Sequence, residues 1–77
     1  MRLTKRSVES IAVQAREQFF WDEDLPGFGV RIHPSGRRVY FVQYRSKGRT
    51  RRYPLGVHGA VTADQARRQA RGIVGDV

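Results

Sequence analysis

The first helix that the sequence predicts lies close to the N-terminus. Four apolar residues there recur at intervals of three and four, with polar residues on the opposite side: Val8, Ile11, Ala12 and Ala15. This is the spacing of an amphipathic helix. Thr4 suits its N-cap, because the hydroxyl can accept a hydrogen bond from a backbone N–H of the first turn. We therefore expect a short helix from Thr4 to Ala15.

An aromatic cluster changes the pattern after this helix. Phe19, Phe20 and Trp21 have the bulk that favours a strand in a small sheet, which we expect between Gln18 and Asp22. The acidic run that follows, Asp22-Glu23-Asp24, is typical of a solvated turn. Leu25-Pro26-Gly27-Phe28-Gly29 then predicts a sharp reversal, because proline fixes one backbone dihedral and glycine permits positive φ.

Three further segments alternate with the period of two that is typical of strands. The alternating positions are, in chain order, Phe28, Val30 and Ile32; Tyr40, Val42 and Tyr44; and Arg51, Tyr53 and Leu55. Turns at His33–Gly36 and Lys47–Arg49 separate the three strands. The second strand begins apolar on both faces, which places it centrally. Pro54 indicates that the third lies at an edge, where a missing N–H does no harm.

A second helix is predicted from about Ala63 to Ile73. Thr62 and Gln65 have the spacing of a capping box, in which each side chain accepts a hydrogen bond from the other residue's backbone N–H. A narrow stripe of mostly small residues can approach a sheet closely: Ala63, Ala66, Ala70 and Ile73. Arg67, Arg68 and Arg71 lie outside this stripe.

Together these elements predict an α+β fold: a three-stranded antiparallel sheet packed on a C-terminal helix, with a short N-terminal helix and an additional short strand. The helix covers the face formed by Phe28, Val30, Ile32, Tyr40, Val42, Tyr44, Tyr53 and Leu55. The opposite face, which we call the open face, presents Arg31, His33, Val39, Phe41, Gln43, Arg45, Thr50 and Arg52.

Length and composition narrow the class of protein. The 77 residues suffice for a single domain, and without cysteine its core must come from apolar packing. The longest apolar run, Val39 to Val42, is far shorter than the roughly 20 residues of a membrane-spanning helix. The N-terminus also lacks the apolar stretch of a signal peptide. We expect a soluble intracellular protein with no membrane partner.

Charge indicates the kind of partner. Fifteen Lys and Arg against seven Asp and Glu give a formal net charge of +8 and a pI near 11.3. The cations concentrate in a middle stretch that contains no acid: Arg31, Arg37, Arg38, Arg45, Lys47, Arg49, Arg51 and Arg52. Such a block favours a polyanion. The alternative is a surface kept basic for solubility, but such surfaces usually mix both signs.

No arrangement typical of catalysis is found in the sequence. A nucleophile with its base, or a pair of tuned carboxylates, is not evident, so we expect no catalytic residues. His33 and His58 lie beside turn residues without a close acidic neighbour, which predicts polar loop histidines. Asp22, Glu23 and Asp24 point in alternating directions and are poor joint ligands for a cation. We expect neither a metal nor another cofactor.

Nucleic-acid binding fits the open face better. A small sheet fits the major groove of B-DNA, where Arg pairs with guanine and Gln with adenine. The candidates for reading bases are Arg31, Gln43, Arg45 and Arg52. Those for contacting phosphates are Arg38, Lys47, Arg49 and Arg51. His33 and Phe41, which share the open face, complete the candidate DNA-binding residues.

Two other functions remain open. RNA could stack on Tyr40, Phe41 and Tyr44, but alternation assigns both tyrosines to the covered face and leaves Phe41 as the one aromatic on the open face of that strand. A protein-interaction module could instead use Val39 and Phe41 as apolar anchors, with the arginines meeting an acidic surface.

A series of short motifs resembles a known family. The motifs are Trp21-Asp22, Leu25-Pro26-Gly27-Phe28-Gly29-Val30-Arg31, Pro34-Ser35-Gly36, Tyr44-Arg45, Gly48-Arg49, Leu55-Gly56, Thr62 and Ala66-Arg67. Their order and spacing resemble the N-terminal arm-type DNA-binding domain of prophage integrases, which are tyrosine recombinases. The similarity runs from Leu3 to about Arg71. The fold of that family, similar to plant AP2 domains, agrees with the one predicted above.

The resemblance implies a role in site-specific recombination. The domain would bind arm-type sites in double-stranded DNA near the ends of a mobile element, in the bacterial cytoplasm and in association with the nucleoid. It would support integration and excision of a viral genome, while a separate C-terminal domain, absent from this chain, supplies catalysis. Gly75-Asp76-Val77 would then begin a linker, and residues 1–77 would be a fragment of a longer integrase. Other integrase protomers or accessory factors are further possible partners.

Overall fold

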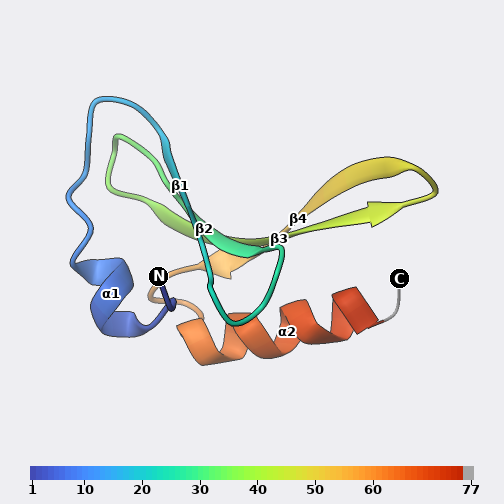
Figure 1. The fold of residues 1–77 in the computed structure, drawn as a ribbon. Coiled ribbons are helices and arrows are strands. Elements are labelled where there is room, and N and C mark those ends of the chain that lie inside the picture. The colour runs from blue at the N-terminus through green and yellow to red at the C-terminus, as the bar shows by residue number, and fades with distance from the viewer. Residues whose placement is uncertain (76–77) are drawn as a thin grey trace.

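The computed structural model describes residues 1–75 of the chain. In chain order its elements are α1 (Lys5–Glu9), β1 (Gln18–Trp21), β2 (Phe28–Ile32), β3 (Arg38–Ser46), β4 (Arg49–Val57) and α2 (Ala63–Gly75). The strands form one four-stranded antiparallel sheet in the order β1-β2-β3-β4. Both helices lie on the same side of this sheet, which leaves its other face open (Figure 1). The α+β fold is confirmed, and the short additional strand is a full member of the sheet.

The core lies between the sheet and the helices. Its buried residues come from the N-terminal segment, α1, strands β2, β3 and β4, and α2: Leu3, Val8, Phe28, Val30, Tyr40, Val42, Leu55, Ala63, Ala66 and Ala70. Phe28 and Tyr40 stack with ring centroids 6.0 Å apart. Burial of one such large apolar side chain contributes about 1.5–3 kcal/mol. The alanines of α2 allow the helix to approach the sheet closely, as the small-residue stripe predicted.

The first helix is shorter than expected. It ends at Glu9, with Thr4 as its N-cap, so the predicted extent to Ala15 is wrong. Val8 is the buried residue of this helix, whereas Ala12 and Ala15 are exposed and offer little apolar area. The Arg38 guanidinium donates hydrogen bonds to the carbonyls of Val8 and Ile11 and so satisfies them without a further helical turn.

The second helix begins as predicted. The Thr62 hydroxyl accepts from the Gln65 N–H at 3.1 Å, and the Gln65 side chain accepts from the Thr62 N–H at 2.9 Å. Arg68 and Arg71 are exposed, but Arg67 is buried although it was placed outside the sheet-facing stripe. Of the expected linker, Gly75 is the last residue of α2, and Asp76 and Val77 lie outside the described residues.

Two side chains differ from the predicted division of the sheet. Phe41 was expected to be exposed but retains only 3% of its exposure, because aromatic residues of β1 pack over it. Tyr53 was expected beneath α2 but is 50% exposed. The reason is that β4 is an edge strand, as Pro54 predicted, and α2 packs mainly against β3. A bulge opposite Tyr40 and Phe41 inserts Leu55 into the core.

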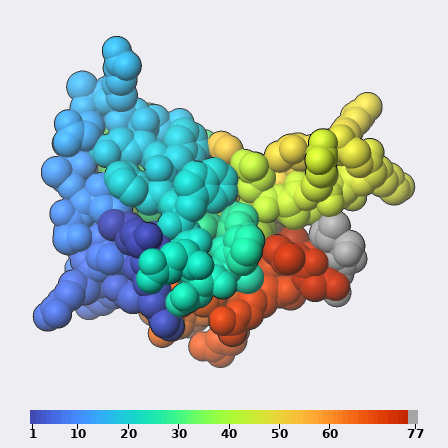
Figure 2. Space-filling view, in the orientation of Figure 1, coloured from blue at the N-terminus to red at the C-terminus, as the bar shows by residue number. Residues whose placement is uncertain are grey.

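The far half of the β3–β4 hairpin projects from the body of the domain (Figures 1 and 2). Lys47 and Gly48 form its turn, both with positive φ. All residues of the hairpin from Lys47 to Pro54 are exposed. The hairpin therefore offers a narrow, basic arm that a partner can reach from several sides.

Candidate nucleic-acid interface

The open face contains more aromatic surface than the alternation within single strands indicated. Strand pairing sets Phe19 opposite Arg31 and Trp21 opposite Gly29, and Gly29 in turn lies opposite Phe41. Phe19 and Trp21 are 38% and 43% exposed, and both rings meet Phe41 edge to face at centroid distances of 6.0 and 5.2 Å. Sequence analysis missed this cluster because cross-strand register decides which side β1 presents. Alternation along β1 could have indicated this surface, since Phe19 and Trp21 lie on the opposite side of the strand from the partly buried Phe20.

Arg52 is held in place on the open face. Its guanidinium lies 4.8 Å from the Phe19 ring centroid and 4.9 Å from that of Phe41. The same guanidinium donates a hydrogen bond to the side-chain oxygen of Gln43 at 2.8 Å. Cation–π contacts and a fixed hydrogen bond restrict an otherwise flexible side chain. The structure thus brings two predicted base-reading residues, Gln43 and Arg52, into one unit.

Arg31 and Arg45 flank this unit. Arg31 lies on β2 and forms an ion pair with Glu17, Nε to carboxylate oxygen 3.3 Å. Arg45 lies further along the hairpin, opposite Thr50, and is exposed. The four predicted base-reading residues therefore share the open face, spread over three adjacent strands.

The predicted phosphate-binding residues divide into two groups. Lys47, Arg49 and Arg51 are exposed on the projecting hairpin, although Arg51 pairs with Tyr44 and points to the covered side. Arg38 lies apart from them. Its guanidinium donates to the carbonyls of Val8, Gly36 and Ile11 at 3.1, 3.2 and 2.8 Å, which joins β3 to the end of α1.

His33 belongs to the turn between β2 and β3. Its Nδ1 accepts a hydrogen bond from the Ser35 N–H at 3.1 Å and lies 2.9 Å from the Ser35 hydroxyl. The ring is exposed and stabilises the turn. Its Nε2 is the nitrogen that these contacts leave available to a partner.

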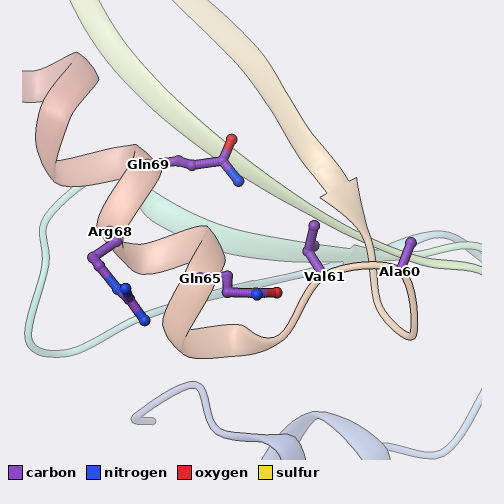
Figure 3. A pocket seen from close by; sticks show the side chains of 5 residues that line it. All are labelled: Ala60, Val61, Gln65, Arg68 and Gln69. Carbon is purple, nitrogen blue, oxygen red and sulfur yellow. The ribbon is translucent and has the colours of Figure 1, made fainter.

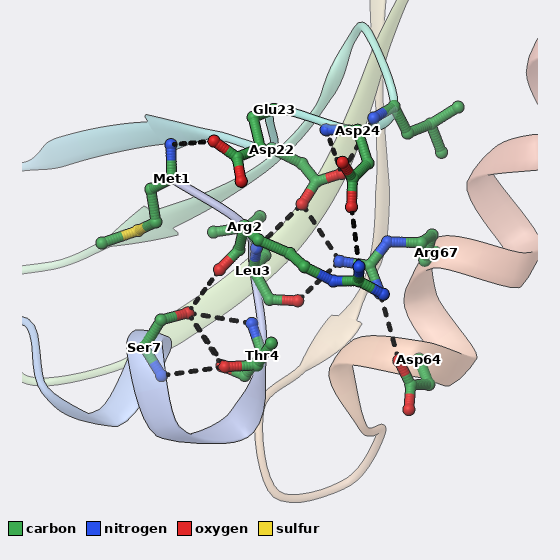
Figure 4. A network of polar contacts seen from close by, with 11 residues as sticks. Met1, Arg2, Leu3, Thr4, Ser7, Asp22, Glu23, Asp24, Asp64 and Arg67 are labelled. Atoms are coloured by element: carbon green, nitrogen blue, oxygen red, sulfur yellow. Dashed lines mark hydrogen bonds and ion pairs between the residues drawn. The ribbon is translucent and has the colours of Figure 1, made fainter.

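A buried charge network lies on the other side of the sheet (Figure 4). The Asp22 carboxylate accepts from the N–H groups of Leu3 and Leu25 at 2.8 and 2.9 Å and from Arg67 at 3.0 Å. Arg67 also donates to the Leu3 carbonyl at 2.6 Å and to Asp64 at 3.1 Å. The solvated turn expected at Asp22 is therefore wrong. This network ties the N-terminus, β1 and α2 together.

The Asp22 carboxyl remains ionised in this environment. Burial alone would raise the pKa of Asp22, but the hydrogen bonds from the Leu3 N–H and the Arg67 guanidinium outweigh it and hold the pKa below its ordinary value. Alternation along β1 places Asp22 on the side of Phe20. Residues 63, 66, 67 and 70 have helical spacing, so a signal for burial of Arg67 was also present.

His58 connects β4 to α1. Its Nε2 donates to the Glu9 carboxylate at 2.6 Å, and its Nδ1 lies 2.8 Å from the Tyr40 hydroxyl. The expectation that His58 has no close acid is therefore wrong, because Glu9 approaches from 49 positions away in the sequence. The hydrogen bond from His58 lowers the pKa of Glu9. Burial, reinforced by the Glu9 charge, raises the pKa of Tyr40 to about 12, so its hydroxyl stays protonated and can donate to Nδ1.

Surface hollows also lie outside the open face. One of about 420 Å³ lies between α2 and the loop before it, lined by Ala60, Val61, Gln65, Arg68 and Gln69 (Figure 3). Over residues 1–75, no three His, Asp or Glu side chains gather as a metal site would require. Nor is any helix in that part of the chain long and apolar enough to cross a membrane.

The domain therefore has one covered face and one open face rich in arginine, an arrangement that suits a small DNA-binding domain. The model of a protein family described as the Arm DNA-binding domain matches residues 3–77. The chain belongs to this family, the arm-type DNA-binding domains of phage-type integrases. Such a domain is not itself catalytic, and its partner is DNA. Comparison with curated proteins gives no match.

Proposed function

We propose that this domain binds arm-type sites by inserting its open face into the major groove of duplex DNA. The observation that carries the proposal is the ordered pair Gln43 and Arg52 at the centre of that face, with Arg31 and Arg45 beside it. Arg and Gln in fixed orientations suit the hydrogen-bonding edges of guanine and adenine. Lys47 and Arg49 on the hairpin would neutralise flanking phosphates.

We also propose a wider role, which family membership supports. In this proposal residues 1–77 act as one domain of a longer prophage integrase of the tyrosine recombinase type. The domain holds the ends of a mobile element while another domain recombines DNA, in the bacterial cytoplasm at the nucleoid. The membership in an arm-type family supports this role.

Fluorescence anisotropy of labelled duplexes across a salt series tests the proposal. DNA from the ends of the parent element should bind more tightly than random DNA. If four to six phosphates are neutralised, log affinity should fall with log salt at a slope of roughly −4 to −5. Equal, weak binding to both duplexes would contradict recognition of arm sites.

A pair of charge reversals tests which surface binds. Arg45→Glu, on the open face, should lower affinity by more than tenfold, since it removes one contact and adds a like charge. Arg68→Glu makes the same change of net charge on α2 and is the matched control. Equal losses in the two variants would show that only net charge matters. A larger loss for Arg68→Glu would move the interface to α2.

A second candidate function is favoured by the exposed rings of Phe19 and Trp21. They lie on β1 at an edge of the sheet and could contact another integrase protomer or an accessory factor. In that case Trp21→Ala would impair assembly of the integrase on DNA and leave duplex binding by the domain unchanged. Native gel analysis of assembled complexes separates the two functions.

A further inference from the structure

A pocket of about 210 Å³ opens on the open face beside the aromatic cluster. Its lining consists of Arg31, Val39, Phe41, Arg52 and Pro54. Phe41 is almost fully buried and Val39 is half-buried, so the floor is apolar, whereas the two arginines stand at opposite sides. A cavity of about 150 Å³ accommodates benzene, so the pocket has room for the edge of a pyrimidine ring.

The walls of the pocket are fixed before any partner arrives. Phe19 and Trp21 hold Phe41 edge to face on one side. Arg52 is restrained by two rings and by Gln43, and Arg31 by Glu17. A second hollow, of about 460 Å³, shares Arg31, Val39 and Pro54 with the pocket. The pocket is therefore the deeper, apolar part of a groove that follows the open face.

The partner of such a pocket must present an apolar group on an anionic surface that accepts hydrogen bonds. In the major groove that group is the 5-methyl of a pyrimidine, which thymine carries and cytosine acquires by methylation. We propose that the pocket binds one pyrimidine 5-methyl group, packed against Val39 and Phe41, while Arg52 donates to the neighbouring base. This inference rests on the proposed docking of the open face in the major groove.

Base analogues in the DNA test the proposal. The domain first selects its preferred duplex from a random pool. Each thymine is then replaced in turn by deoxyuridine, which removes only the methyl group, and each cytosine by 5-methyldeoxycytidine, which adds one. At one position, loss of the methyl should weaken binding about three- to fivefold, the effect of burying one such group. A gain of that size at one cytosine would identify methylcytosine as the source instead.

Protein variants tie the effect to the pocket. Val39→Thr keeps the shape but makes the floor polar, and Val39→Ile fills the space. In both, the penalty for removing the methyl should shrink to less than twofold. Val13 is an exposed residue before β1, so Val13→Thr makes the same chemical change outside the pocket. It should leave the penalty for removing the methyl group unchanged. Thermal unfolding checks that each variant folds. Because the two Val39 variants change the pocket in different ways, each is a separate test.

Three results would overturn the proposal. The first is a duplex in which every analogue stays within twofold of the parent. The second is a methyl penalty that is unchanged in Val39→Thr and Val39→Ile. The third is tighter binding to the selected single strand than to its duplex, which would assign the pocket to an unpaired base. If no duplex is selected over random DNA, the proposed function itself fails, and this inference fails with it.

Discussion

At the scale of single residues, the buried ion pair of Asp22 and Arg67 is the contact whose loss should affect the stability of the domain most. The Asp22 side chain is 0% exposed and that of Arg67 only 6%, and their charged atoms are 3.0 Å apart. Arg67 also lies over the Phe28 ring at 5.5 Å. A buried pair of this kind gains little over apolar residues, but removal of one partner leaves the other charge uncompensated.

Asp22→Asn should therefore destabilise the domain strongly. We expect a loss of about 3 kcal/mol or more in the free energy of unfolding, because Arg67 then loses its buried counter-charge and keeps only the exposed Asp64. Asp24→Asn is the matched control, since Asp24 pairs with Arg2 at 3.1 Å on the surface. That change should cost less than about 1 kcal/mol. Urea denaturation of both variants measures the difference, and similar losses would refute the buried pair's importance.

The same carboxylate predicts how stability depends on pH. The folded-state pKa of Asp22 lies below its ordinary value of 3.8, so near that pH the unfolded chain binds more protons than the folded one. The contribution of Asp22 is complete above that value and is lost as the pH falls through the folded pKa. Urea denaturation between pH 6 and 3 should show this decline. Asp22→Asn should flatten it; an unchanged slope would contradict the assignment.

The sequence predicts which face of the sheet a side chain occupies better than it predicts which distant residue that side chain contacts. Alternation and helical spacing allow Asp22 and Arg67 to lie on the covered side, but the predicted solvated turn and small-residue stripe left both out of the core. Nothing local links residues 45 positions apart. The contact between Glu9 and His58 has the same character. Candidate residues on one strand, such as Gln43 and Arg45, follow from alternation alone. The cation–π contacts of Arg52 with Phe19 and Phe41 do not follow from alternation, because they depend on the register of four strands.

At the scale of elements, the turn before β2 illustrates a second kind of constraint. Gly27 has φ +88°, and a Cβ there would lie 2.3 Å from the backbone oxygen of Gln43. The Gln43 N–H also donates to the Gly27 carbonyl at 2.7 Å. This loop therefore packs directly on the backbone of Gln43 in the middle of β3, and Gln43 is itself a base-reading candidate.

Two glycine substitutions separate conformation from close approach. Gly36 has φ +95° but open space around it, so Gly36→Ala should cost only the backbone term, about 1–2 kcal/mol. Gly27→Ala should cost a further 1–3 kcal/mol or so, because β3 must move to relieve the clash. Thermal or urea unfolding measures both free energies. Equal losses would mean that the turn does not press on β3.

The strands were predictable because alternation is strong and turn residues separate them. Observed bounds such as Phe28–Ile32 and Gln18–Trp21 follow the pattern closely. The first helix was not, because its length depends on tertiary hydrogen bonds from Arg38. Helical spacing continued to Ala15, but two alanines bury too little surface to hold further turns.

At the scale of the whole molecule, stability is unevenly distributed. Tyr40 and Val42 are fully buried between the sheet and α2, whereas the hairpin from Lys47 to Pro54 is exposed. Its last pairs, Arg45 with Thr50 and Ser46 with Arg49, have solvent on both faces. Segments with few buried contacts open at a small fraction of the global unfolding free energy.

Hydrogen exchange should therefore distinguish two parts of the same strand. In the free domain, amides near the hairpin turn, residues 45–50, should exchange many times faster than those of residues 40–42, which open only when the domain unfolds. Bound duplex DNA should slow the hairpin amides selectively, because the open face and its arm become covered. If α2 amides from Arg68 to Arg71 slow instead, the DNA lies against the helix and the open face is not the interface. One experiment measures the exchange rates of the hairpin and α2 amides together. The rates in the free domain are the reference for both outcomes.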